Sequence, residues 1–217
     1  MRAVDAVIFD CEGVVLDTED LWDRGYEELF RRRGMEFDRA RLKHVIGGMS
    51  LYDIAGMLVP MYGWPESQRE IESEILEIMK VIFERDLKFI DGFMEFYEEQ
   101  VVGKGRKSAV ATAMYDQLME IADRKTGIRR LFKGHVYTIA EVGNKGKPDP
   151  AIFNYAAEKI GADKERSVGF EDSPHGIEAL NRAGIFSIGI ATTYGRDKLK
   201  AAKAVFGSYD EVNLSEL

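Results

Sequence analysis

Short apolar runs alternate with amphipathic stretches along most of the chain, and this alternation is the feature that most constrains the fold. Several runs are continuously apolar and rich in Val, Ile and Phe, which is typical of strands covered on both faces. Repeated strand and helix predict an α/β fold with a parallel sheet between helices. The predicted strands are at 3–9, 107–112, 134–139, 166–170, 186–191 and 204–207, and the clearest helices between them at 114–125, 149–161 and 173–184.

The stretch 17–88 breaks this alternation, because its apolar residues recur with a helical period and no convincing strand lies among them. An all-helical insert directly after the first strand predicts a second, smaller domain. We therefore expect residues 1–16 and 89–217 to form a Rossmann-like catalytic core and residues 17–88 to form a helical domain. The predicted helices of that domain are at 18–34, 38–47, 50–63 and 65–87.

Charge and composition exclude several classes of protein. With 30 basic and 38 acidic residues the net charge is −8, which argues against a general nucleic-acid binder with a basic face. The apolar runs are far shorter than the roughly 20 residues of a membrane span. The single cysteine, Cys11, cannot form an intramolecular disulfide, and the chain does not open on a signal-peptide pattern. We expect a soluble cytoplasmic protein with no nucleic-acid or membrane partner; nothing in the sequence indicates its oligomeric state.

The candidate site residues, most of them polar, follow the first four predicted core strands, at the point where each strand ends. Because the carboxyl ends of parallel strands lie at one edge of the sheet, where ligands bind in such folds, we expect these residues to converge on one crevice. They are Asp10 and Glu12 after the first strand, Thr112 and Ala113 at the second, Lys147 after the third, and Glu171 and Asp172 after the fourth.

The predicted crevice combines carboxylates with one hydroxyl and one lysine. Carboxylates packed closely repel one another unless their pKa values rise or a cation is bound. Oxygen ligands without His or Cys favour Mg²⁺, which keeps positions for water and for phosphate oxygens. A metal, a lysine and a hydroxyl orient a phosphoryl group, while one carboxylate can attack phosphorus. The pattern thus indicates phosphoryl transfer on a small phosphorylated metabolite.

Four segments resemble, in order, the four motifs of the haloacid dehalogenase-like (HAD) hydrolases. The insert resembles the helical cap of the subgroup that contains phosphoglycolate phosphatases and beta-phosphoglucomutases. The resemblance covers essentially the whole chain, and it implies a Mg²⁺-dependent phosphatase that acts through an aspartyl phosphate. The segments are "FDCEGVVLDTE" (9–19), "VATAM" (110–114), "GKPDPAIF" (146–153) and "GFEDSPHGIEALNRAG" (169–184).

Carried over by position, the resemblance implies a role for each candidate site residue. Asp10 would be the nucleophile and a metal ligand, and Glu12 the general acid and base. Metal contacts would also come from the carbonyl of Glu12, from Asp172 and, through water, from Glu171. The phosphate would be held by Thr112, the amide of Ala113 and Lys147, which would also pair with Asp10.

One residue departs from the motif: Glu12 stands where the phosphatases and mutases of the family usually have aspartate. Proton transfer depends on hydrogen-bond reach of about 2.6–3.2 Å, so an added methylene requires a different rotamer. Two alternatives therefore stay open, an intramolecular sugar phosphomutase and a catalytically weak phosphate-binding module. The mutase is disfavoured by "GMSLYD" (48–53), where Leu51 replaces the arginine of the similar beta-phosphoglucomutase loop.

Overall fold

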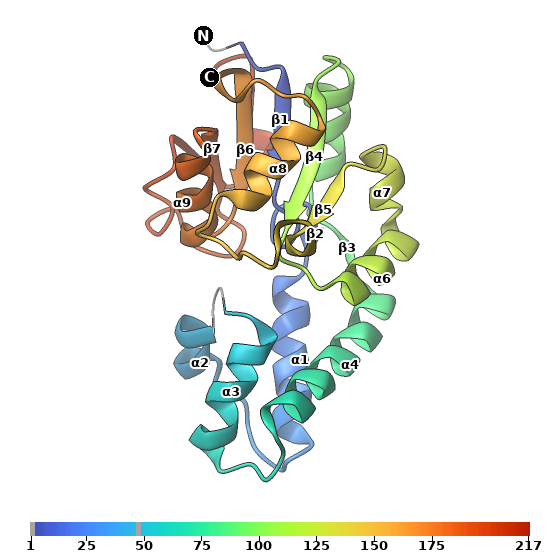
Figure 1. Cartoon of the computed structure of the whole chain (residues 1–217), viewed down its shortest axis with the longest axis vertical. Helices are drawn as coiled ribbons and strands as arrows, with labels where there is room; N and C mark the ends of the chain where they lie inside the picture. Colours follow the sequence, from blue (N-terminus) through green and yellow to red (C-terminus); the bar gives the residue numbers. More distant parts are fainter. Residues whose placement is uncertain (1–2, 47–48) are drawn as a thin grey trace.

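The computed structural model describes residues 3–46 and 49–217, and a six-stranded parallel sheet forms the middle layer of its upper part in Figure 1. All the predicted strands are present, some shorter than expected, and the prediction of a Rossmann-like α/β core is confirmed. The strands run in the order β5-β4-β1-β6-β7-β8 across the sheet. Their bounds are Ala6–Phe9 (β1), Lys107–Thr112 (β4), Val136–Thr138 (β5), Ser167–Glu171 (β6), Phe186–Ile190 (β7) and Ala204–Phe206 (β8).

The sheet is buried on both faces, as the continuous apolar runs predict. In β1, Ala6 and Ile8 belong to one hydrophobic cluster, while Val7 and Phe9 belong to a second, larger one. Successive side chains of a strand point to opposite faces, so β1 contributes to both cores. The ring of Phe9 stacks on Phe170 of the neighbouring strand, with ring centroids 5.2 Å apart.

The helices of the core cover these two faces. Helices α8 and α9 pack on the side of Ile8, and α6 lies in the cluster of Phe9. Helix α7 and the short 3₁₀ turns were not predicted, since three- or four-residue segments carry too little periodicity. The bounds are Phe93–Phe96 (α5), Asp116–Thr126 (α6), Ile128–Leu131 (α7), Ala151–Lys159 (α8) and Pro174–Ala183 (α9), with a π-helix Tyr97–Val102 (η1) and 3₁₀ turns Ile139–Val142 (η2), Lys164–Arg166 (η3) and Tyr209–Glu211 (η4).

Four helices lie beyond one end of the sheet, and we call residues 19–86 the helical region (Figure 1). A short antiparallel ribbon joins it to the core. Its strands, β2 (Leu16–Asp17) and β3 (Lys88–Phe89), include Asp17 and Lys88, which were expected to lie in a strand-free stretch. The helices are Glu19–Arg31 (α1), Arg39–Ile46 (α2), Leu51–Tyr62 (α3) and Gln68–Asp86 (α4).

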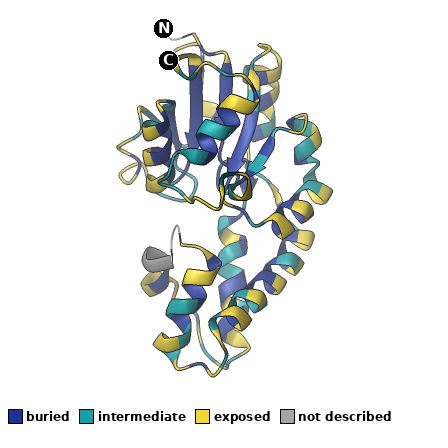
Figure 2. Cartoon of the chain, viewed as in Figure 1, coloured by how far each residue is buried: buried dark blue, intermediate teal, exposed yellow. Residues whose placement is uncertain are grey.

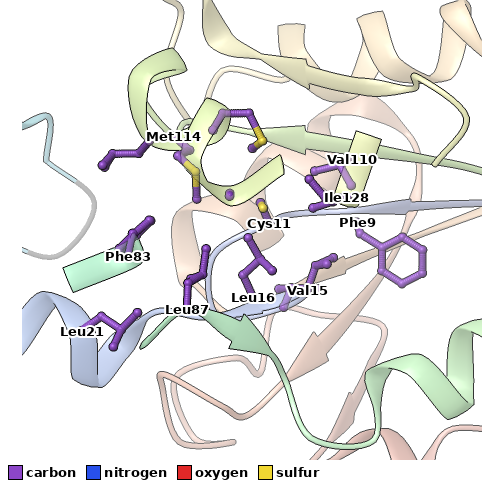
Figure 3. Close-up of a cluster of buried hydrophobic side chains, with 14 of the residues drawn as sticks. Phe9, Cys11, Val15, Leu16, Leu21, Phe83, Leu87, Val110, Met114 and Ile128 are labelled. Atoms are coloured by element: carbon purple, nitrogen blue, oxygen red, sulfur yellow. The ribbon is translucent and has the colours of Figure 1, made fainter. Parts of the chain in front are cut away.

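Hydrophobic packing continues from the sheet into the helical region. Figure 2 shows buried stripes on the helices of both parts, and Figure 3 shows where the two meet. Phe9 and Cys11 of the core belong to the same cluster of buried residues as Leu21 of α1 and Phe83 of α4. Cys11 is therefore a small buried core residue.

Among the described residues, no helix is both long enough and apolar enough to cross a membrane.

Candidate active site

Three carboxylates meet at the carboxyl ends of two adjacent strands. Asp10 follows β1, and its backbone N–H donates to the carbonyl of Phe170 in β6 at 2.9 Å. Glu171 ends β6, and Asp172 follows it. The pairing of β1 with β6 brings the three side chains together, and each offers an oxygen within 4.8 Å of the others. All three are buried.

Lys147 bridges two of these carboxylates. Its Nζ lies 2.5 Å from Asp10 Oδ1 and 2.5 Å from Glu171 Oε1. The lysine does not follow β5 directly as the sequence suggested, because the η2 turn intervenes and Lys147 lies in the loop that leads to α8. Its Nζ also lies 5.1 Å from the ring centroid of Phe153, so packing and charge both fix its position.

Burial and mutual repulsion shift the pKa values of this cluster. Burial raises the pKa of Asp10 to about 7, with Lys147 opposing the rise and Glu171 adding to it. The pKa of Asp172 is raised well above its ordinary value, first by burial and then by the charges of Glu171 and Asp10. Burial opposes the charge of Lys147, but the two carboxylates outweigh it and raise its pKa. Three carboxylates and one cation thus leave a deficit of positive charge.

The donor set fits a hard divalent cation. The oxygens of Asp10, Glu171 and Asp172 converge, and neither a histidine nor the cysteine joins them among the described residues. Mg²⁺ prefers such oxygen ligands, typically one or two carboxylates with the remaining positions open. A bound cation would also relieve the repulsion that raises the pKa values of these carboxyl groups.

Two glycines allow the close approach on which this cluster depends. Gly13 has φ +71°, and a Cβ there would overlap the carboxylate of Asp172 and lie 2.6 Å from Thr193 Oγ1. Gly176 lies in the first turn of α9, and a Cβ there would overlap the carboxylate of Glu171. A side chain at either position would push the acidic residues apart.

Hydrogen bonds hold Glu171 from the side opposite Lys147. Its Oε2 accepts from the backbone N–H of Asp172 at 3.0 Å and from that of Ser173 at 2.9 Å. The Ser173 hydroxyl donates to the same oxygen at 2.9 Å. Thr193 makes a side-chain hydrogen bond with Asp172, which favours the charged form of that carboxyl group. The carboxylates of Glu171 and Asp172 are thus each oriented by neighbouring polar groups.

Thr112 and Ala113 lie at the end of β4, on the other side of β1. The Thr112 hydroxyl is buried and accepts the backbone N–H of Met114 at 3.1 Å. Since that bond uses one lone pair of the Thr112 hydroxyl oxygen, the hydroxyl group can still donate its proton to an anion. Ala113 lines the cavity in front of the carboxylates.

Glu12 does not belong to the cluster of three carboxylates, and its side chain contacts the helical region. Its Oε1 accepts a hydrogen bond from Trp22 Nε1 in α1 at 2.7 Å. Burial raises the pKa of Glu12, while the indole and Lys147 oppose the rise. The sequence singled out Glu12 but not its partner, because no motif links two residues ten positions apart.

A cavity of about 1040 Å³ lies between the sheet edge and the helical region. Of the predicted site residues, five line it, namely Asp10, Glu12, Ala113, Lys147 and Asp172. Thr112 and Glu171 are buried and do not line it. The opposite wall comes from α1 and α3 and includes Glu19, Trp22, Asp23, Tyr26, Leu51, Asp53 and Ile54.

Several further residues of this site were not anticipated. Thr193 and Tyr194, after β7, line the cavity, whereas His175, which also lines it, was already visible in the fourth motif. Tyr115 lines it too and donates from its hydroxyl to Glu72 of α4 at 3.1 Å, which links the core to the helical region. Gly176 was not singled out either, although a glycine inside a helical pattern often has a packing or functional reason.

Comparison with known proteins identifies the family. The family model of haloacid dehalogenase-like hydrolases matches residues 4–184. The chain is 26% identical to a validoxylamine A 7'-phosphate phosphatase of Streptomyces hygroscopicus subsp. limoneus, over 94% of each chain. It is 30% identical to a phosphorylated carbohydrates phosphatase of Thermotoga maritima, over 84% of this chain and 82% of that protein.

A solved structure agrees with these relatives. A Thermotoga maritima protein, provisionally described as a beta-phosphoglucomutase, superposes with a TM-score of 0.76 at 29% identity, over 94% of each chain. The similarity predicted from the four motifs is therefore confirmed, as is the assignment to the hydrolases. The chain belongs to the haloacid dehalogenase-like hydrolase family.

Proposed function

We propose that this protein is a Mg²⁺-dependent phosphatase that hydrolyses a small phosphomonoester through an aspartyl phosphate on Asp10. The observation that carries the proposal is the contact of Lys147 with both Asp10 and Glu171, beside Asp172 and at the floor of one cavity. The arrangement supplies a nucleophile, a fixed cation and a place for a metal within one small volume. The relatives named above as phosphatases support the same reaction.

In this proposal Asp10 attacks the phosphorus and the bond to the leaving oxygen breaks. Glu12 gives its proton to that oxygen, so that the alcohol leaves neutral. The resulting carboxylate of Glu12 then takes a proton from the water that attacks the aspartyl phosphate. Inorganic phosphate is released and Asp10 is regenerated. Thr112, the amide of Ala113 and Lys147 bind the phosphoryl oxygens throughout.

We propose that Asp10, Asp172 and the backbone carbonyl of Glu12 hold Mg²⁺ directly and that Glu171 acts through water. When bound, the ion supplies positive charge next to the phosphoryl oxygens. The hydrogen bonds from Ser173 and Thr193 keep the carboxylates oriented. These second contacts support the site because the residues that orient a ligand influence metal affinity.

We also propose that residues 17–88 are a cap domain on a core of residues 1–16 and 89–217. The ribbon of β2 and β3 would be the hinge, since the chain enters the helical region through β2 and leaves it through β3. Closure would exclude water and bring α1 and α3 to the leaving group. The apolar and aromatic side chains of this wall would select the alcohol portion of the substrate.

The lining of the cavity favours a phosphatase over a mutase. A mutase needs a cation for a second phosphate on the cap side. Among the described residues that line the cavity, those from the helical region include no lysine, arginine or histidine. Leu51, at the start of α3, is buried and apolar at the position where the similar mutase loop has arginine.

The proposal is tested by phosphate release from a panel of small phosphomonoesters, including sugar and polyol phosphates, with Mg²⁺ and with a chelator. We expect release that depends on Mg²⁺ and is lost in Asp10→Asn. Asp91→Asn, at a fully exposed position with a side chain 94% accessible, is the matched control and should retain activity.

A mutase or a binding module would give different results on the same panel. A mutase would convert a sugar monophosphate into its isomer and need a bisphosphate activator. A binding module would retain Mg²⁺ and a phosphate analogue without turnover, and Glu12→Asp would then raise activity sharply. Either result would contradict the phosphatase proposal.

A further inference from the structure

The general acid proposed for this enzyme is bound by a residue of the opposite wall. Trp22 Nε1 donates to Glu12 Oε1 at 2.7 Å, within normal hydrogen-bond range. Glu12 lies two residues after Asp10, whereas Trp22 lies in α1, and both line the cavity. The contact therefore crosses from the sheet edge to the helical region.

Aromatic packing fixes the direction of the indole. The ring of Trp22 stacks on Tyr26 with centroids 6.2 Å apart and meets Phe83 of α4 edge-on at 6.1 Å. These contacts use the apolar body of the ring and leave the N–H for Glu12. A donor held by its own packing gives its acceptor one preferred position.

The hydrogen bond depends on the extra methylene of glutamate. The backbone of Glu12 is fixed by β1 before it, by a bridge to Leu16, and by the bond from the Gly13 N–H to the carbonyl of Leu16 at 2.9 Å. An aspartate would withdraw the carboxylate by about 1.5 Å, the length of one C–C bond. The oxygen would then lie beyond hydrogen-bond reach of the indole. The hydrogen bond therefore requires both Glu12, in place of the usual aspartate, and Trp22.

We propose that Trp22 is a positioning residue for Glu12 in the phosphatase reaction, a proposal that rests on the function proposed above. The indole binds one carboxyl oxygen and turns the other toward the scissile bond. That second oxygen passes its proton to the leaving oxygen as the P–O bond breaks. It then accepts a proton from the water that attacks phosphorus. Trp22 itself exchanges no proton and contacts no reacting atom.

The contact is tested first without catalysis, by the indole N–H signals of the metal-free protein in a ¹⁵N–¹H spectrum. The chain has two tryptophans, so Trp22→Phe and Trp64→Phe assign the two signals. Trp64 Nε1 is buried and has no hydrogen-bond partner among the described residues, which makes it an internal control. Glu12→Ala should move the Trp22 signal and speed its solvent exchange, and leave that of Trp64 in place. An unmoved Trp22 signal would overturn the proposal.

The role in proton transfer is tested by leaving-group dependence in single-turnover experiments. An alkyl phosphate needs a proton on its leaving oxygen, whereas 4-nitrophenol leaves as a stable anion. General acid catalysis contributes about 10²–10⁴-fold. We expect Trp22→Phe, which keeps an aromatic ring, to slow alkyl release about tenfold and nitrophenol release less than twofold. Trp64→Phe should slow neither, and a merely structural role of Trp22 would slow both equally.

Substitution of the partner completes the test. In a Glu12→Asp background, where the carboxylate no longer reaches the indole, Trp22→Phe should have no further effect on alkyl release. An undiminished tenfold effect would overturn the proposal. A wild-type protein that releases neither alcohol would defeat the phosphatase function and this proposal together. Wild-type turnover with an unaffected Trp22→Phe variant would defeat the positioning role alone.

Discussion

The two walls of the cavity are built on different principles. At the sheet edge, short β-strands deliver Asp10, Glu171 and Asp172 from fixed backbone positions, and Lys147 is held by ion pairs. The wall from the helical region presents aromatic and apolar side chains beside acidic ones, and its acidic residues pair with neighbouring groups of the same region. Arg39, for example, binds Glu19 and Asp23. The first wall concentrates uncompensated charge for chemistry, whereas the second shapes a volume.

This contrast implies different costs of substitution on the two sides. At the sheet edge a polar group that is removed leaves a buried partner unsatisfied, which costs both stability and transition-state binding. In the helical region, apart from the Trp22 N–H that binds Glu12, a polar group that faces the cavity should change mainly which alcohol fits there. The following predictions are ordered by the size of the effect that we expect.

The largest effect is expected for Lys147→Met. The substitution removes the cation between Asp10 and Glu171 and, in the proposed reaction, one ligand of the phosphoryl group, so turnover should fall by about 10³-fold or more. Lys145→Met is the matched control, because Lys145 is exposed in the same loop and does not line the cavity. Steady-state phosphate release measures both. Retained activity in Lys147→Met would show that the sheet edge does not act through this lysine.

The second prediction concerns how the free energy of unfolding of the metal-free protein depends on pH. Because burial raises the pKa of Asp10 from about 4 to about 7, the folded protein keeps a proton that the unfolded chain loses in that interval. The free energy of unfolding should therefore fall as pH rises from 4 to 7, by on the order of 3 kcal/mol. Urea unfolding in chelator measures this decline. The decline should become shallower in Asp10→Asn, where Asp172 still contributes to it, and keep its full size in the control Asp91→Asn.

Gly13→Ala should be the next most damaging change. Its Cβ would overlap the Asp172 carboxylate, and the residue would keep φ +71°, so we expect a loss of about 3 kcal/mol in stability together with loss of activity. Gly34→Ala has a similar φ of +67° with nothing within 4 Å, and it should cost only about 1 kcal/mol. If urea unfolding showed the same loss of free energy of unfolding in Gly13→Ala and Gly34→Ala, the role assigned to the contact with Asp172 would be wrong.

The smallest effect is expected on the helical side. Tyr26 is buried at the cavity wall, so Tyr26→Phe removes one polar group there and should change KM about threefold with kcat nearly constant. Tyr52→Phe, at an exposed position away from the cavity, should change neither constant. If Tyr26→Phe instead lowered kcat by orders of magnitude, the division of labour between the two walls would be wrong.

The fold and the sheet edge could be predicted from the sequence because both depend on local patterns. Continuous apolar runs identify buried strands, and the residue after each strand lies at a known edge. The positions of Asp10 and Asp172 at that edge could therefore be predicted from the sequence alone. The ribbon at Asp17 and Lys88 escaped prediction, since two-residue strands depend on pairing between segments that are far apart in sequence.

The helical wall could not be predicted in the same way. Its helices were visible as periodic segments, but which side chains face the cavity depends on how α1 and α3 pack against α4. From the sequence alone, Trp22 and Tyr26 could equally be residues buried in the helical core or residues that face the cavity. The partner of Glu12 therefore became evident only from the assembled structure, although Glu12 itself stood out as a departure from its motif.

The central claim is that Asp10 carries the phosphoryl group during turnover. The most direct measurement is acid quenching of a reacting mixture, followed by mass spectrometry of the peptide that contains residues 9–19. We predict one added phosphoryl group on Asp10 in the presence of Mg²⁺, at higher occupancy in Glu12→Gln, in which the attacking water lacks its base. Phosphate release without any phosphoryl group on Asp10, or with the group on another residue, would contradict the account.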